Sequence, residues 1–199
     1  MGHGGDVIAE LTADHGEVKD FFQRIDRTTA ADERRTLADK MTIELVRHSI
    51  AEEMYLYPAV REHLDGGDSI ADKEIEDHAE AEGLLKELED LDPSGAAFTT
   101  TMRRIETEVL DHIADEEENL FPALRRACPA GMLHDLGDKV RTAKKTAPTR
   151  PHPGIPSTPP ANKLVGRGIG LVDRVRDLLS GRGKGDDDES EGADRSRAA

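Results

Sequence analysis

Two segments of the chain carry a histidine that is followed, four residues later, by a glutamate. The pairs are His48 with Glu52 and His112 with Glu116, and in both copies a second glutamate follows at once. Residues four positions apart lie on the same face of a helix, so each imidazole should point the same way as its carboxylate. Because imidazole and carboxylate groups are common metal ligands, the repeated spacing indicates metal binding.

Two further histidines, His15 and His78, stand upstream of these pairs. Each precedes the histidine of its pair by a nearly equal interval, 33 residues in the first half and 34 in the second. The chain is therefore quasi-duplicated, and each half supplies one histidine and then a His-x-x-x-Glu pair. Two halves packed about a pseudo-twofold axis would place Glu52 and Glu116 on opposite sides of a two-metal centre, where each can bridge both ions.

The burial of so many ionisable side chains favours metal ions over a purely structural explanation. A buried carboxylate without a partner costs several kcal/mol or becomes protonated. A lone histidine on an apolar helix face is usually a hydrogen-bonded core residue. Four histidines on four such faces, two of them in the same kind of pair, are better explained by a positive charge placed among them.

The ligand types narrow the choice of metal. Mixed imidazole and carboxylate ligands suit iron, manganese or zinc, and the pattern lacks the thiolates that favour copper(I) or an iron–sulfur cluster. Paired ions bridged by carboxylates are typical of di-iron and di-manganese bundles. Two histidines per ion, two shared carboxylates and an oxo or hydroxo bridge would leave an octahedral ion with an open position for dioxygen, nitric oxide or peroxide. A plain structural bundle with one zinc ion is the alternative.

Two more residues are candidate ligands. Glu82 lies four residues after His78, and Tyr55 lies three residues after Glu52. The alternatives are a solvated Glu82 and a Tyr55 that packs in the core. The other notable residues are expected to be aromatic side chains at the bundle end (Tyr57, Phe121), glutamates facing water (Glu53, Glu117, Glu118) and surface or linker histidines (His3, His63, His134, His152).

The elements that must position these residues are helices. Apolar residues recur at steps of three and four over four segments between about residues 6 and 127, which predicts four amphipathic helices with the histidines on their apolar faces. Short connections then favour an all-α, up-down-up-down four-helix bundle over residues 1–128. Pro58 and Pro122 should end or kink the second and fourth helices.

The rest of the chain is predicted to extend this bundle. It divides into a short helical extension (129–147), a Pro-rich linker (148–162), an amphipathic basic helix (163–182) and a disordered acidic tail (183–199). The basic helix is suited to docking on anionic lipid or on a partner helix. Weak packing on the bundle, or disorder, is an equal alternative for this segment.

Composition excludes several classes of protein. The 199 residues carry a formal net charge of −15 and only 3% aromatic residues, which argues against a nucleic-acid partner. The single cysteine, Cys128, excludes an internal disulfide and favours a reducing compartment. Neither a signal-peptide pattern nor an apolar run of membrane-spanning length is found, so a cytoplasmic protein is expected.

These motifs together resemble the hemerythrin-like domain, also called the HHE cation-binding domain, in its actinobacterial form, over about residues 5–128. The resemblance implies a four-helix bundle with a non-haem di-iron centre and two bridging glutamates. In the oxygen-carrying members the third helix has His-x-x-x-His, whereas here Glu82 follows His78. One iron would then lack a neutral imidazole, and an anionic ligand in its place would favour ferric iron over reversible oxygen carriage. The ligands implied are His15, His48, Glu52, His78, His112 and Glu116.

The resemblance also implies a set of functions. The first is the binding or sensing of a small ligand, namely oxygen, nitric oxide or peroxide, at an open iron position. The alternatives are enzymatic: catalase-like peroxide detoxification, or iron donation in iron–sulfur cluster repair. Members linked to cluster repair often carry a cysteine-containing segment at the N-terminus, and no cysteine precedes His15 in this chain. The repair function is therefore the less favoured one.

Overall fold

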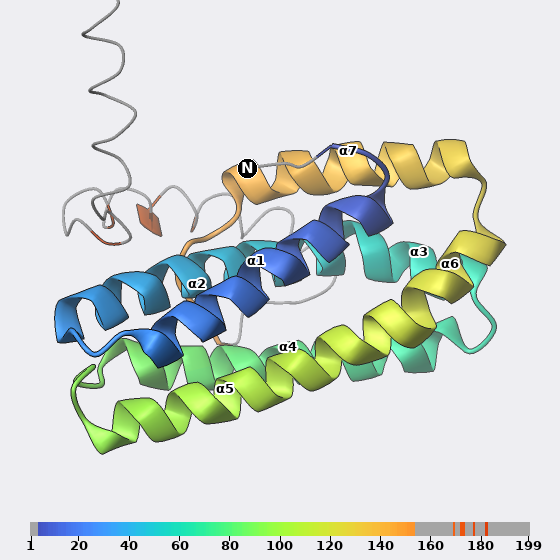
Figure 1. The fold of residues 1–199 in the computed structure, drawn as a ribbon. Coiled ribbons are helices and arrows are strands. Elements are labelled where there is room, and N and C mark those ends of the chain that lie inside the picture. The colour runs from blue at the N-terminus through green and yellow to red at the C-terminus, as the bar shows by residue number, and fades with distance from the viewer. Residues whose placement is uncertain (1–3, 154–168, 170–171, 174–176, 178–181, 183–199) are drawn as a thin grey trace, which may run out of the picture.

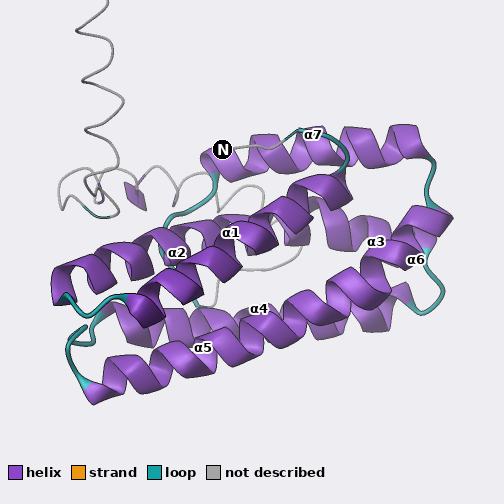
Figure 2. Cartoon of the chain, viewed as in Figure 1, coloured by secondary structure: helices purple, strands orange, loops and turns teal. Residues whose placement is uncertain are grey.

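Helices make up all of the regular structure that the computed structural model describes (Figure 2). The described residues are 4–153, 169, 172–173, 177 and 182. The acidic tail, most of the Pro-rich linker and nearly all of the predicted basic helix lie outside them. None of the described helices combines the length and the apolar character that a membrane crossing requires.

Four long helices form the bundle: α1 (Val7–Arg27), α2 (Ala31–Ala51), α4 (Gly67–Glu89) and α5 (Ala96–Asp115). Helix α1 packs beside α2, and α4 packs beside α5 (Figure 1). Asp6 begins α1, because its side chain accepts a hydrogen bond from the Ala9 N–H at 2.9 Å and so caps a free backbone donor. The predicted all-α hemerythrin-like bundle is confirmed.

The second and fourth helices do not end at their prolines, as the sequence had suggested. Helix α2 continues through a π-helical turn, η1 (Glu52–Leu56), into α3 (Tyr57–His63), and α5 continues through η2 (Glu116–Leu120) into α6 (Phe121–Ala127). The Tyr57 N–H bonds to the Glu52 carbonyl, and the Phe121 N–H bonds to the Glu116 carbonyl, five residues earlier. A proline would remove a hydrogen bond from an α-helix and clash with the preceding turn, and the wider turn accommodates it.

The buried apolar side chains form two clusters along the bundle. On α1, Leu11 belongs to one cluster and Val18 to the other, and His15 lies between them. On α2, Leu45 and Ala51 are divided in the same way. The buried ionisable residues therefore form a polar layer that is closed above and below by apolar packing.

Helix α7 (Ala130–Thr146) lies along α1 and α2 (Figure 1). Its apolar side chains Leu133, Leu136 and Val140 belong to the same cluster as Leu11. A Cβ added at Gly137 would lie 2.9 Å from the Gly5 carbonyl oxygen, so this glycine permits a close approach to the start of α1. The predicted helical extension is thus present, and it shares the core of the bundle.

The first residues of the predicted linker also lie against the bundle. Pro148, Thr149 and Pro151 are buried. The Arg150 guanidinium lies 3.4 Å from a carboxylate oxygen of Glu89 on α4. Residues 148–153 are therefore packed rather than solvated, which apolar periodicity could not indicate.

Candidate metal centre

The six predicted ligands converge in the polar layer between the two apolar clusters. Each of them is at most 9% exposed. Ligand atoms of His15, His48, Glu52 and Glu116 lie within 4.8 Å of one another, and we call this group the first position. Around the second position lie two overlapping groups. Those groups are Glu52 with His78 and His112, and Glu116 with His112 and Glu74.

Glu52 and Glu116 belong to both positions. At the first position, Glu116 Oε2 lies 3.4 Å from His15 Nε2, and Glu52 Oε2 lies 3.1 Å from His48 Nε2. At the second position, the same oxygens lie 3.7 Å from one histidine and 3.3 Å from the other. The sequence argument from a pseudo-twofold axis places the two glutamates in this shared location.

Several buried ligand atoms lack a hydrogen-bond partner within the described part of the chain. They include His15 Nε2, Glu52 Oε1 and Glu116 Oε2. A buried polar atom left unpaired costs about 1–3 kcal/mol, and more when the group is charged. Cations between these atoms would satisfy them, so the donor set fits a pair of bound metal ions.

Every histidine of the centre turns its Nε2 atom inward and has a carboxylate behind its Nδ1 atom. This arrangement fixes the ring and leaves the Nε2 lone pair free for a metal ion, as is usual for metal-binding histidines. The four Nδ1-to-oxygen distances are 2.9 Å for His15 with Glu117, 3.2 Å for His48 with Asp14, 3.2 Å for His78 with Glu53 and 2.9 Å for His112 with Glu74.

Two of these supporting carboxylates correct a sequence prediction. Glu53 and Glu117 were expected to face water, but they are only 11% and 30% exposed and each lies beside a histidine of the other half. Glu118 is exposed, as expected. In both copies of the motif, the residue directly after the bridging glutamate therefore supports a histidine.

The carboxylates dominate the electrostatics of the layer. Burial alone would lower the pKa of His48, but Glu52 and Asp14 outweigh it and raise that pKa to about 10. The same opposition, with Glu52 and Glu53 as the carboxylates, raises the pKa of His78 to about 10. Without a metal ion, these imidazoles hold protons at neutral pH. A metal ion must therefore displace protons to bind.

Tyr57 reverses a second prediction. Tyr55 was the candidate ligand and Tyr57 was expected at the bundle end, but Tyr57 is fully buried in the centre and Tyr55 is half-buried beside an apolar cluster. The Tyr57 hydroxyl lies 3.1 Å from His78 Nε2 and donates to Glu116 Oε1 at 3.2 Å. The π-turn explains the reversal, because it advances the inward-facing position by one residue beyond the α-helical spacing.

The third helix supplies a different carboxylate from the one predicted. Glu82 joins none of the metal-binding groups among the described residues, and its Oε1 accepts a hydrogen bond from the His152 N–H at 2.9 Å. Burial and the nearby Glu53 raise the pKa of Glu82. Glu74, which is 1% exposed, takes the place at the centre. Its position four residues before His78, on the same helix face, was the signal available in the sequence.

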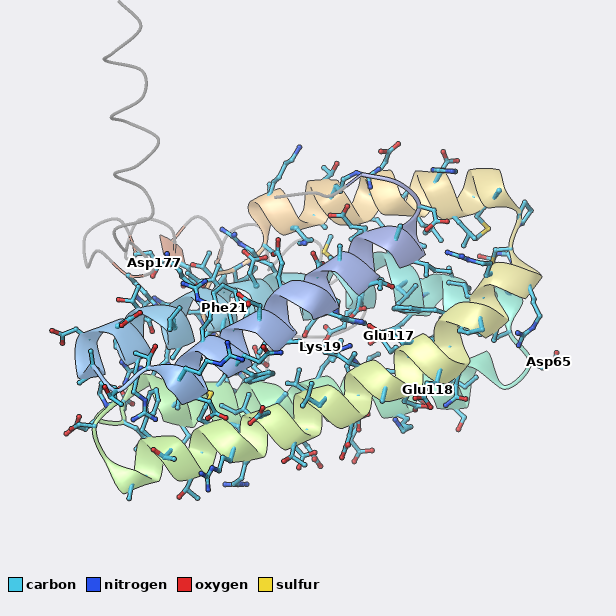
Figure 3. The ribbon with its side chains drawn as sticks, in the orientation of Figure 1. Lys19, Phe21, Asp65, Glu117, Glu118 and Asp177 are labelled. Atoms are coloured by element: carbon cyan, nitrogen blue, oxygen red, sulfur yellow. The ribbon has the colours of Figure 1, made fainter. Side chains whose placement is uncertain are left out.

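The two positions are not equivalent. Phe121 stacks on His15 with ring centroids 5.7 Å apart, whereas Tyr57 brings a hydroxyl to His78. Behind the first position, Lys19 lies 3.3 Å from the Glu117 carboxylate (Figure 3). Among the described residues, no lysine or arginine pairs with Glu53 behind the second position. The second position is therefore the more anionic of the two.

Comparisons with known proteins agree with this arrangement. Residues 6–124 match the family model of the hemerythrin HHE cation binding domain. An uncharacterized hemerythrin-like protein of Schizosaccharomyces pombe is 24% identical over 167 residues, which cover 83% of this chain and 82% of that protein. A DNA nickase of a Nostoc species is 26% identical over 134 residues, but these cover 67% of this chain and only 38% of the nickase.

A solved structure shares the fold. It is the crystal structure of a hemerythrin HHE cation binding domain-containing protein from Mycobacterium kansasii, with a TM-score of 0.62 and 21% sequence identity. The match covers 70% of this chain and 85% of that one. With the family model matching more than half of the sequence, the chain belongs to the hemerythrin HHE cation-binding family.

Proposed function

We propose that the protein holds two iron ions, one at each position, and binds a small ligand at a coordination site that the side chains leave open. The observation that carries this proposal is the sharing of Glu52 and Glu116 between both groups of ligand atoms. Carboxylates bridging two ions in a helical bundle are typical of di-iron proteins. The candidate ligands are oxygen, nitric oxide and peroxide.

The chain's own residues favour iron over a structural zinc ion. A structural zinc site usually has four protein ligands of its own, closed around a single ion. Here the glutamates are shared and the histidines are divided into two pairs, which suits two ions of higher coordination number. The buried thiol of Cys128 belongs to an apolar cluster and to none of the ligand groups found in the described residues.

Iron in such a centre supplies a redox-active ion with room for one more ligand. The polar layer is closed on two sides by apolar clusters, which exclude water and limit access to small molecules. The carboxylates behind the histidines hold the rings in place while a ligand exchanges. This combination supports binding or sensing of a small ligand.

Metal analysis and absorption spectroscopy test this proposal. The purified protein should contain about two iron ions per chain, and its near-ultraviolet spectrum should change when oxygen, nitric oxide or peroxide is added to the anaerobic iron-loaded form. A His134→Ala variant is the matched control, because His134 is exposed on α7 outside the centre. A protein that binds one zinc ion and shows no near-ultraviolet iron band would contradict the proposal.

The Tyr57 hydroxyl favours a second candidate, catalase-like peroxide detoxification. Disproportionation converts two hydrogen peroxide molecules into two water molecules and one oxygen molecule, so one peroxide loses two electrons and two protons that the other gains. A buried hydroxyl that donates to Glu116 and lies beside His78 can pass a proton within the centre without bulk water. Oxygen release from added peroxide tests this candidate, and its absence with the iron-loaded protein would leave ligand binding alone.

A further inference from the structure

We propose that α7 completes the metal centre, and that Lys144 is a positioning residue that acts through Asp14 on His48. The proposal rests on the metal centre argued above. Lys144 is only 6% exposed although it carries a charge, and it lies near the end of α7, outside the region that supplies the ligands. A buried lysine is costly unless it is paired, so its partners indicate its role.

Lys144 and His48 bind the two oxygens of a single carboxylate. The Lys144 ammonium group donates to Asp14 Oδ1, and the other oxygen, Oδ2, lies 3.2 Å from His48 Nδ1. The lysine therefore holds the carboxylate in the orientation that aims its second oxygen at the ring. On its inward side, His48 Nε2 lies 3.1 Å from Glu52. A continuous line of polar contacts thus joins α7 to the first position.

The packing of α7 keeps the lysine in place. Val140 and Ala143, on the turn that precedes Lys144, are buried in the apolar cluster that α1 shares. One turn earlier, the Arg141 guanidinium lies 3.3 Å from Glu10 Oε2, and Lys144 itself lies 3.8 Å from Glu10 Oε1. Both carboxylates on this face of α1 are therefore paired with cations from α7.

The other half of the bundle shows the same arrangement made from its own residues. Asp77 precedes His78 as Asp14 precedes His15, and Asp77 Oδ2 lies 3.8 Å from His112 Nδ1. Lys73, five residues before His78 on α4, lies 2.9 Å from Asp77.

The equivalent position in the first half, five residues before His15, is Glu10. The first half therefore lacks an internal lysine for Asp14, and α7 supplies one. This comparison makes the Lys144 contact part of a repeated lysine–aspartate–histidine pattern rather than an isolated ion pair.

A double-mutant cycle on the full chain tests the proposal. The four proteins are the wild type, Lys144→Met, Asp14→Asn and the double variant, each loaded with iron, and the measurement is the rate at which a chelator removes the metal. Lys144→Met should speed the loss of one ion by roughly 10- to 100-fold, which is the usual effect of removing an outer partner of a metal ligand. In the Asp14→Asn background the same substitution should have little further effect.

Two variants serve as controls. Lys139→Met removes an exposed lysine from the same helix and should leave the chelation rate unchanged. Lys144→Arg keeps the charge and should restore most of the wild-type rate. If Lys144→Met does not fold, as judged by helical circular dichroism, Lys144→Gln replaces it in the cycle, because its amide still offers a hydrogen-bond donor.

The outcomes separate this inference from the proposed function. A wild-type protein that does not hold two ions would overturn the proposed function. A wild type with two ions and a Lys144→Met variant with the same chelation rate would overturn only the role of Lys144. An equal acceleration by Lys144→Met with and without Asp14→Asn would show a general structural role, and that result would also overturn the positioning role.

Discussion

Tyr57 Oη lies 3.1 Å from His78 Nε2, on the side of the ring that faces the shared glutamates. This places a hydroxyl at the second position only, because the matching residue of the other half is Phe121, which stacks on His15. Burial raises the pKa of Tyr57 well above its ordinary value, and Glu116 and Glu52 add to the effect. The hydroxyl therefore keeps its proton over the physiological pH range and can act as a hydrogen-bond donor.

The two tyrosines of the chain form a matched pair for testing this hydroxyl. If the protein disproportionates peroxide, Tyr57→Phe should lower oxygen release by about 100-fold, because a positioned proton donor contributes about that much to a rate. Tyr55→Phe should leave the rate unchanged, since Tyr55 packs beside an apolar cluster. An oxygen electrode measures both rates, and equal losses in the two variants would refute a special role for Tyr57.

Loss of a bridging glutamate should be more damaging than loss of a histidine. Glu116→Ala removes a ligand from both positions, so the iron content should fall from about two ions to nearly none. His112→Ala should retain about one ion, at the first position. Elemental analysis measures the content, and a Glu116→Ala protein that kept two ions would show that the ligand assignment is wrong.

Metal loading should also stabilise the fold. A ligand present at 100 times its dissociation constant adds about 2.7 kcal/mol to the free energy of unfolding. The melting temperature of the wild type should therefore rise on loading, and that of Glu116→Ala should not. His134→Ala should behave as the wild type does.

The supporting carboxylates can be tested by neighbouring substitutions in one motif. Glu117→Gln should speed iron loss to a chelator by roughly 10-fold, because Glu117 lies 2.9 Å from His15 Nδ1. Glu118→Gln makes the same chemical change one residue later, at an exposed side chain, and should have no effect. Equal rates for the two variants would mean that Glu117 gives no support to the metal ligand.

The metal-free protein should lose stability at alkaline pH. The pKa values of His48 and His78 are about 10 and that of His112 is about 9, all above the ordinary value of 6.5. Groups with a raised pKa in the folded state stabilise it fully below their unfolded pKa, and this contribution is lost as the pH rises through 9 to 10. The melting temperature of the metal-free protein should therefore fall between pH 7 and pH 10.

The same protons should oppose metal binding at lower pH. Each imidazole must release its proton to bind an ion, so the apparent metal affinity should rise as the pH increases from 6 to 9. Calorimetric titration in two buffers of different ionisation enthalpy measures the number of protons released. A binding constant that did not change with pH would contradict the assignment of these histidines as ligands.

The inequivalence of the two positions should be visible during loading. The second position has Glu53 without a cationic partner among the described residues and Glu74 close to His112, so its excess negative charge should attract the first ion. Substoichiometric titration with cobalt(II) should give one spectrum up to one equivalent and a different increment afterwards. A single uniform increment would indicate equivalent positions.

Periodicity and spacing predicted much of this structure. The four bundle helices follow from apolar residues at steps of three and four, and the convergence of His48 and Glu52 with their counterparts follows from the duplicated motif. Both are local patterns, repeated at equal intervals. A helix face read from such a pattern is reliable as long as the helix keeps its α-helical turn.

The failures have identifiable physical causes. Tyr57 was misplaced because the π-turn changes the periodicity at the motif itself. Glu74 was missed because the search for a carboxylate ran in one direction from His78. Lys144 could not be found from local spacing, since its contact with Asp14 joins residues 130 positions apart and depends on how α7 docks. Long-range docking of a helix has no signature in the spacing of nearby residues.

The two π-turns have a consequence for how this centre can change by mutation. Each turn contains one residue more than an α-helix would use, and removing one residue rotates everything that follows by about 100° about the helix axis. A single-codon deletion within residues 52–56 would swing the Tyr57 hydroxyl out of the centre, while a substitution can only replace the group at the end of a fixed ring. Small insertions and deletions, rather than point changes, are therefore the genetic events that would move a side chain into or out of contact with the ions.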